Sequence, residues 1–169
     1  MNAESQLASF FSKHKPATVK IGKALRLKLR ARLPGLNELV YVYERRESLV
    51  ISYSPTGNGM EGICALALSP KGVQLHFGKG ALLSKSDPKK LLQGQGKTVR
   101  HIVLSKLADY SRAEIEILLA AAVKLAKLRL DAGTQGSVII KTGCQKQRER
   151  QTTRGTRPTA VRRSARPRR

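Results

Sequence analysis

Tryptophan is absent from this chain of 169 residues, and aromatic side chains make up only 4% of it. A core with so few rings must be packed mainly by aliphatic side chains, which supply most of the 40% of residues that are apolar. That content is enough for one core, so we predict one domain with some additional chain. The apolar runs are short, and none approaches the length that a membrane-spanning helix requires.

Cysteine occurs only twice. Cys64 lies in the apolar run GICALALS, where we expect it to be a small buried hydrophobic residue, whereas Cys144 lies in a polar, basic segment. Two such different environments do not favour a disulfide, so we expect a reducing compartment and predict a cytoplasmic location. The N-terminal stretch carries Glu4 and has no apolar centre, which is not typical of a secretory signal peptide.

Acidic residues are also scarce, because 11 Asp and Glu accompany 33 Lys and Arg, for a formal net charge of +22. Such a surface attracts polyanions, which include nucleic acid, anionic membranes and acidic proteins. The excess is densest from Lys141 to Arg169, where 11 basic residues accompany one acid, Glu149. This stretch has almost no large apolar residues, so we predict that it is a disordered tail.

Two helices are predicted in the first 33 residues. The first is a short amphipathic helix over residues 4–13. The next segment alternates like a strand from Leu25 to Leu33, but Ile21, Leu25, Leu29 and Leu33 also form a row at i+4 spacing. We favour the helix because its residues are strong helix formers and Thr18 is available as an N-cap.

The remaining pattern predicts about five strands followed by a helix. The strands are expected within residues 38–44, 47–54, 62–69, 73–77 and 100–105. Ser111 and Glu114 have the spacing of a capping box for the final helix. We therefore predict an α+β fold, a two-layer sandwich in the order helix, about five-stranded antiparallel sheet, helix, with a disordered basic C-terminal tail. The predicted units are an N-terminal arm (1–17), the domain (18–132) and the tail (133–169).

The glycine-rich segment 91–98, LLQGQGKT, ends like a phosphate-binding loop. Leu91 stands where that loop requires its first glycine, and a predicted strand follows where a helix is required. We therefore predict a turn that leads into the strand. Segment 78–83, GKGALL, resembles a dinucleotide fingerprint but has Leu83 in place of its last glycine or alanine.

The stretch VQLHFGKGALLSKSDPKKLLQGQGKTVRHIVL, with LPGLNELVY and YSPTG before it, resembles the YdhG-like family of bacterial proteins, a domain of unknown function numbered 1801. The resemblance covers about residues 18–128. Its most specific part comprises Asp87, Pro88, Leu91, Leu92, Gly94, Gly96, Lys97, Val99, Arg100, His101 and Ile102. It implies a frataxin-like α+β arrangement, no assigned activity for most members, and an iron-chaperone name for some. The segment VYERRES between Tyr41 and Leu49 departs from the family pattern.

An iron site would need clustered carboxylates, because iron ions prefer oxygen ligands. The charged side chains of the first long helix are instead all basic, namely Lys20, Lys23, Arg26, Lys28, Arg30 and Arg32. The three histidines, His14, His76 and His101, have no metal-ligand spacing. Neither a nucleophile elbow nor a pair of catalytic carboxylates is found in the sequence. We therefore expect no metal, no cofactor and no enzymatic activity.

Three functions remain open. The first is a non-enzymatic binding domain of the YdhG-like family with an unknown ligand. The second is sequence-nonspecific binding of nucleic acid or another polyanion through the tail and the basic helix. The third is a frataxin-like iron chaperone, which the basic helix disfavours. The candidate anion contacts are Lys20, Lys23, Arg26, Arg30, Lys97, Arg100, Arg154, Arg157, Arg162, Arg163, Arg166, Arg168 and Arg169.

Two patterns weigh against a compact anion site or sequence-specific readout. Lys97, Arg100 and His101 are close in sequence, but alternation along a strand places Arg100 and His101 on opposite sides. Phenylalanines available for stacking on bases are few, and no RNA-recognition signature surrounds them. Nucleic-acid binding would then be independent of sequence.

Overall fold

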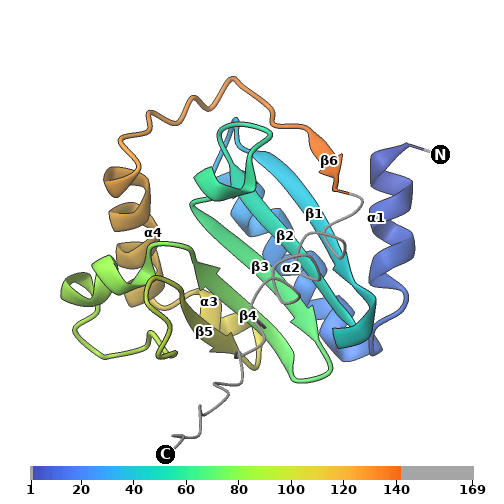
Figure 1. Cartoon of the computed structure of the whole chain (residues 1–169), viewed down its shortest axis with the longest axis horizontal. Coiled ribbons are helices and arrows are strands. Elements are labelled where there is room, and N and C mark those ends of the chain that lie inside the picture. The colour runs from blue at the N-terminus through green and yellow to red at the C-terminus, as the bar shows by residue number, and fades with distance from the viewer. Residues whose placement is uncertain (1, 142–169) are drawn as a thin grey trace, which may run out of the picture.

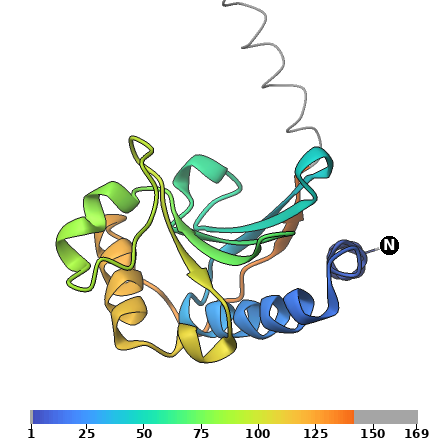
Figure 2. The same cartoon turned by 90° about the horizontal axis from the view of Figure 1, so that it is seen from below.

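A six-stranded sheet forms one layer of the structure, and the helices form a second layer on one face of it (Figures 1 and 2). The structure is a computed structural model that describes residues 2–141. In chain order the elements are α1 (Ala3–Phe11), α2 (Pro16–Arg32), β1 (Asn37–Tyr43), η1 (Glu44–Arg46), β2 (Ser48–Ser54), η2 (Gly59–Glu61), β3 (Cys64–Ser69), β4 (Gly72–Phe77), η3 (Gly80–Ser86), β5 (Arg100–Leu104), α3 (Leu107–Tyr110), α4 (Ala113–Leu125) and β6 (Val138–Ile140), where η marks a 3₁₀ helix.

The strand order is β5-β4-β3-β2-β1-β6. Strands β1 to β5 follow one another as antiparallel neighbours, which confirms the predicted antiparallel meander. Strand β6 was not predicted, and it pairs with β1 in parallel. The Glu38 N–H donates to the Ser137 carbonyl at 2.9 Å, and the Lys141 N–H donates to the Val40 carbonyl at 2.8 Å.

Strand β6 lies inside the range predicted as a tail, so the ordered sheet extends beyond the predicted boundary at residue 133. Three apolar residues beside a basic segment give a weak strand signal. Their parallel pairing requires a return from α4 across the molecule, which local sequence does not encode. The tail arginines among the predicted contacts, and Cys144, lie outside the described residues; these arginines are Arg154, Arg157, Arg162, Arg163, Arg166, Arg168 and Arg169.

The helix starts differ from the predicted caps. Helix α2 begins at Pro16, with Lys15 as an N-cap that makes no side-chain hydrogen bond, so the predicted Thr18 cap is wrong. Proline suits this position because the N–H groups of the first helical turn have no acceptor within the helix, so the missing N–H of proline loses no hydrogen bond. Helix α4 begins at Ala113 after Arg112, so the capping box predicted for Ser111 and Glu114 is also wrong.

The core lies between the sheet and the helices, and the alternation along each strand defines it. In β3, Leu66 and Leu68 are buried, whereas the intervening Ala65 and Ala67 face the other side. Gly22 of α2 lies against Leu68 so closely that an added Cβ would be 2.6 Å from a Leu68 methyl carbon. This glycine therefore lets α2 pack directly on β3.

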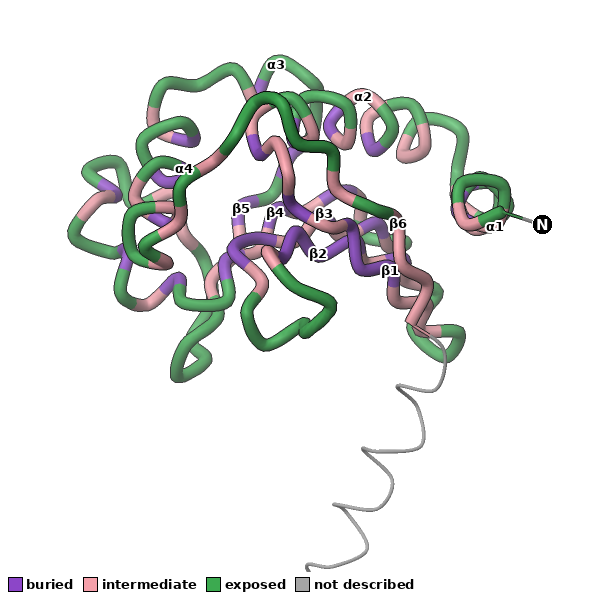
Figure 3. The backbone as a smooth tube through the Cα atoms, turned by 90° about the horizontal axis from the view of Figure 1, so that it is seen from above, coloured by how far each residue is buried: buried purple, intermediate pink, exposed green. Residues whose placement is uncertain are grey.

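Helix α1 belongs to the same core, because Leu7 and Phe11 are buried in the cluster that includes the sheet. Cys64 is also buried there, as predicted, and burial raises the pKa of its thiol to about 12. Figure 3 shows the buried residues concentrated along the strands and on the inner sides of the helices. Within residues 2–141, none of the helices combines the length and apolar character needed to span a bilayer.

Candidate ligand-binding surface

Within residues 2–141, the α-helices cover only one face of the sheet (Figure 2). The opposite face contains a hollow of about 1120 Å³. In Figure 1 this face is turned toward the viewer, with α2 behind the strands. We call this region the sheet hollow. Its lining comes from all of β1 to β4 and from the turns that join them.

Small side chains form the floor of the sheet hollow. The strand register places Val50 and Ala67 side by side in one row, and Ser52 and Ala65 in the next. These four residues occupy the two central strands and lie on the same face, because positions two apart in a strand point the same way. The floor is therefore shallow and nearly flat, with no long side chain rising from its centre.

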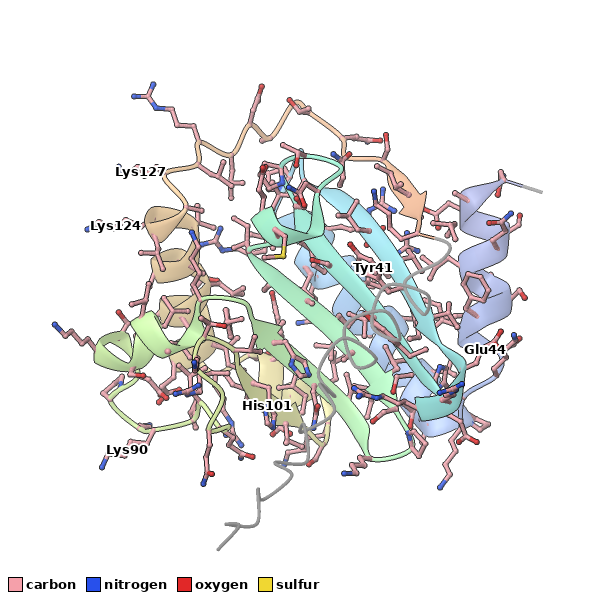
Figure 4. All side chains as sticks on the ribbon, in the orientation of Figure 1. Tyr41, Glu44, Lys90, His101, Lys124 and Lys127 are labelled. Atoms are coloured by element: carbon pink, nitrogen blue, oxygen red, sulfur yellow. The ribbon has the colours of Figure 1, made fainter. Side chains whose placement is uncertain are left out.

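Rings flank this floor on both sides. Tyr41 is opposite Val50 on β1, and Tyr43 follows two residues later on the same face. On the far side, His76 of β4 stacks on His101 of β5, with ring centroids 5.2 Å apart and an interplanar angle of 27°. Figure 4 labels Tyr41 and His101, which lie toward opposite sides of the sheet.

The stacked histidines are held in an environment that favours the neutral form of His76. Its Nε2 is 3.1 Å from Oε1 of Gln74. Burial, and secondarily the charge of His101, lowers the pKa of His76 to about 4. At neutral pH His76 therefore offers an uncharged, planar ring to the hollow.

One end of the sheet hollow is cationic. Arg46, in the turn between β1 and β2, and Lys71, in the turn between β3 and β4, both line it. Since the two turns connect alternate strand pairs of an antiparallel meander, they lie at the same end of the sheet. Among residues 2–141, neither cation forms an ion pair, and no acidic side chain lines the hollow.

The other end is formed by the loop that contains η2, and the residues of this loop that line the hollow are uncharged. Gly59 of this loop lies against Tyr41, and an added Cβ would be 2.2 Å from the tyrosine oxygen. The Asn58 carbonyl accepts a hydrogen bond from the Ser54 hydroxyl at 2.8 Å, which ties the loop to the end of β2. The glycine thus allows the loop to close over Tyr41.

The basic helix α2 presents a different electrostatic surface from the one predicted. Lys20 and Lys23 are exposed, as expected, but Arg26 is not, because only 14% of its side chain is accessible. Its guanidinium donates to both carboxylate oxygens of Glu38 and to Glu4. Arg30 lies 3.0 Å from the Glu4 carboxylate, so two of the four predicted α2 contacts are already paired.

Lys97, Arg100 and His101 do not form one site, which agrees with the alternation expected along this strand. The Arg100 guanidinium donates to the Gly96 and Val99 carbonyls and so closes its own loop. His101 belongs to the stacked pair, and Lys97 is exposed. The glycine-rich segment leads into strand β5, so the predicted turn is confirmed at this position.

The residues that carry the YdhG-like resemblance act largely as scaffold. The Asp87 carboxylate accepts hydrogen bonds from the N–H groups of Leu91 and Leu92, at 2.9 and 2.7 Å. Both leucines then pack against the core. Gly94 has φ of +112°, a conformation in which only glycine is unstrained. Together with Pro88, these residues shape the loop between η3 and β5, outside the sheet hollow.

Sequence reasoning missed Tyr41, Tyr43 and the small floor residues. The signal was present, since the two tyrosines of LVYVYE are two residues apart and therefore share a face of the strand. The pairing of that strand with Val50 and Ala67 follows only from the register.

No group of three or more potential metal ligands occurs among the described residues. Comparison with known protein families, with curated proteins and with solved structures gave no match.

Proposed function

We propose that this chain is a small, non-enzymatic binding domain that holds an anionic ligand in the sheet hollow. The observation that carries the proposal is the placement of Arg46 and Lys71 at one end of a hollow that no carboxylate from residues 2–141 lines. An unpaired cation beside a concave surface attracts an anion more strongly than one on a flat surface. The expectation of a small binding domain comes from the resemblance to the YdhG-like family, which leaves the ligand open.

Titration of ¹⁵N-labelled protein with inorganic pyrophosphate, followed by NMR, tests this proposal. We expect saturable shifts at the β1–β2 and β3–β4 turns. The double variant Arg46→Glu, Lys71→Glu should abolish them. The double variant Lys20→Glu, Lys23→Glu makes the same charge change on α2 and should leave them intact. Absence of saturable shifts, or shifts confined to α2, would show that the sheet hollow is not an anion site.

A second candidate is sequence-nonspecific binding of polyanions through the exposed part of α2. Lys20, Lys23 and Lys28 of this helix are exposed and give its surface a positive charge. If about six cations of the full chain contact duplex phosphates, the logarithm of affinity should fall with the logarithm of salt at a slope near −5. The double variant Lys20→Glu, Lys23→Glu should make this slope less steep if the exposed lysines of α2 contact the phosphates.

The frataxin-like iron proposal has less support. Glu4 and Glu38, the two carboxylates that come together beside α2, are both bound to Arg26. Hydrogen bonds from Arg26 lower the pKa of Glu4, an effect that burial partly opposes. Carboxylates already neutralised by a guanidinium are poor ligands for a metal cation.

A further inference from the structure

We propose that the anionic ligand of the sheet hollow is single-stranded nucleic acid, with bases over the small-residue floor and phosphates at the cationic end. This inference rests on the proposed function and adds the class of ligand. It follows from three features that lie together on one face, namely flanking rings, a flat floor and cations at one end.

The rings and floor favour a planar ligand. Neighbouring strands are about 4.8 Å apart, and the register places Gln74, not His76, directly across from Tyr41. With this offset of two residues, Tyr41 on β1 and His76 on β4 stand about 16 Å apart, diagonally across the floor. Between them the largest side chain is Val50, and Ala65 and Ala67 leave the pleated surface accessible. A base can lie on such a floor and contact a ring at either side, which is how single strands are commonly bound.

The position of the cations sets the course of the backbone. Arg46 and Lys71 lie in turns whose midpoints are two strand spacings apart, or about 10 Å. A phosphate backbone that contacts both must cross the strands at this end. Its bases can then point along the strands toward the loop of Gly59, whose residues facing the hollow are uncharged.

A single strand fits these features better than a duplex or an acidic peptide. In a duplex the base faces are stacked and cannot reach the floor without unpairing, whereas an unpaired base exposes its face. An acidic peptide matches the charge of Arg46 and Lys71 but does not use the flanking rings. The rings therefore discriminate between these ligands.

Fluorescence anisotropy of the full chain with a fluorescein-labelled 15-nucleotide oligo(dT), over a salt series, tests the inference. We expect Tyr41→Ala to weaken binding about ten-fold, through loss of stacking. Ala67→Glu, which places a carboxylate on the floor, should weaken it by at least as much. Ala120→Glu on α4 is the control, because it makes the same charge change at an exposed position outside the hollow, and it should change the affinity less than about two-fold. A duplex of equal length should bind more weakly than the single strand.

Photocrosslinking gives a measurement that does not depend on the variants folding normally. An oligonucleotide with 5-iodouracil bases, irradiated with the unmodified protein, should crosslink to peptides that contain Tyr41, Tyr43 or His76. Crosslinks confined to α2 or to residues 142–169 would overturn the inference, as would equal effects of Ala67→Glu and Ala120→Glu. Competition by poly-glutamate as strong as that by oligo(dT) would also overturn it, because charge alone would then explain binding.

The two proposals can fail separately. If pyrophosphate shifts the two turns but Tyr41→Ala and Ala67→Glu leave oligonucleotide binding unchanged, the hollow is an anion site and the ligand class is wrong. If neither pyrophosphate nor the oligonucleotide contacts the hollow, both proposals are wrong.

Discussion

The two faces of the sheet treat charge in opposite ways. On the helix face, Arg26 is largely buried and both of its partners, Glu38 and Glu4, are carboxylates. On the open face, Arg46 and Lys71 line a hollow without a carboxylate from the described residues. Burial requires that a charge be compensated, whereas a solvated cation at a surface can remain unpaired until a ligand arrives.

The two faces of the sheet also differ in the size of the side chains that they carry. The helix face of β3 carries Leu66 and Leu68, which are fully buried, whereas its open face carries Ala65 and Ala67. Large aliphatic side chains on one face provide stability, and small ones on the other leave space. Alternate residues of this one strand therefore pack in the core and line the hollow.

The largest effect should come from the core. Leu66→Ala should destabilise the fold by about 4 kcal/mol, because it removes a fully buried side chain and leaves a cavity. Ala67→Ser, one residue away on the open face, should cost less than about 0.5 kcal/mol. Urea unfolding of both variants measures the difference. Similar losses in the two would show that the open face is also part of the packed core.

Breaking the compensated charge should have the next largest effect. Glu38→Gln should lower the free energy of unfolding by about 3 kcal/mol, because the largely buried guanidinium of Arg26 would lose the buried carboxylate that compensates its charge. The control is Glu116→Gln, which removes the more exposed pair with Arg32 and should cost less than about 1 kcal/mol. Chemical denaturation measures both losses of stability. Equal losses would show that burial does not make the Arg26–Glu38 pair more important than the exposed pair.

Acid should weaken the fold through His76. Its folded-state pKa of about 4 lies below the ordinary value of 6.5, so the unfolded chain binds more protons between these values. Stability is therefore lost as pH falls from 6.5 to 4, by about 2 kcal/mol once water access to the partly exposed ring is allowed for.

Unfolding of wild type and His76→Gln at pH 7 and pH 4.5 isolates this contribution. The variant should lose less stability between the two pH values than wild type does. His14→Gln is the comparison: burial lowers the pKa of His14 too, but the charge of Glu47 opposes this effect, so the substitution should remove a smaller part of the pH dependence. A pH dependence that is unchanged in His76→Gln would contradict the assignment.

The smallest effect concerns the loop beside the open face. Gly94→Ala should cost about 1 kcal/mol because its φ of +112° strains any side chain. Gly96→Ala should be close to neutral, since its φ is ordinary and an added Cβ would have 3.7 Å to the Val99 carbonyl. Thermal unfolding of the two variants gives the comparison. A larger loss of stability in Gly96→Ala than in Gly94→Ala would show that the strained backbone conformation of this loop is not at Gly94.

The sequence predicted much of the fold because its periodicity is clear. The i+4 row of Leu25, Leu29 and Leu33 correctly predicted a helix, and all three side chains are buried. The apolar run GICALALS predicted both the strand and the burial of Cys64. Helix starts were less predictable, because Pro16 begins α2 without a side-chain cap.

What the sequence by itself determined is therefore the local periodicity of the chain, its excess of positive charge and the turn at Gly94. These depend on neighbours along the chain or on composition alone. Tertiary structure decided which cations are paired, since Arg26 meets Glu38 only where α2 crosses β1. It also decided where the hollow lies, because Tyr41, Ala67 and His76 share a surface only through the register of four strands, and register depends on long-range pairing.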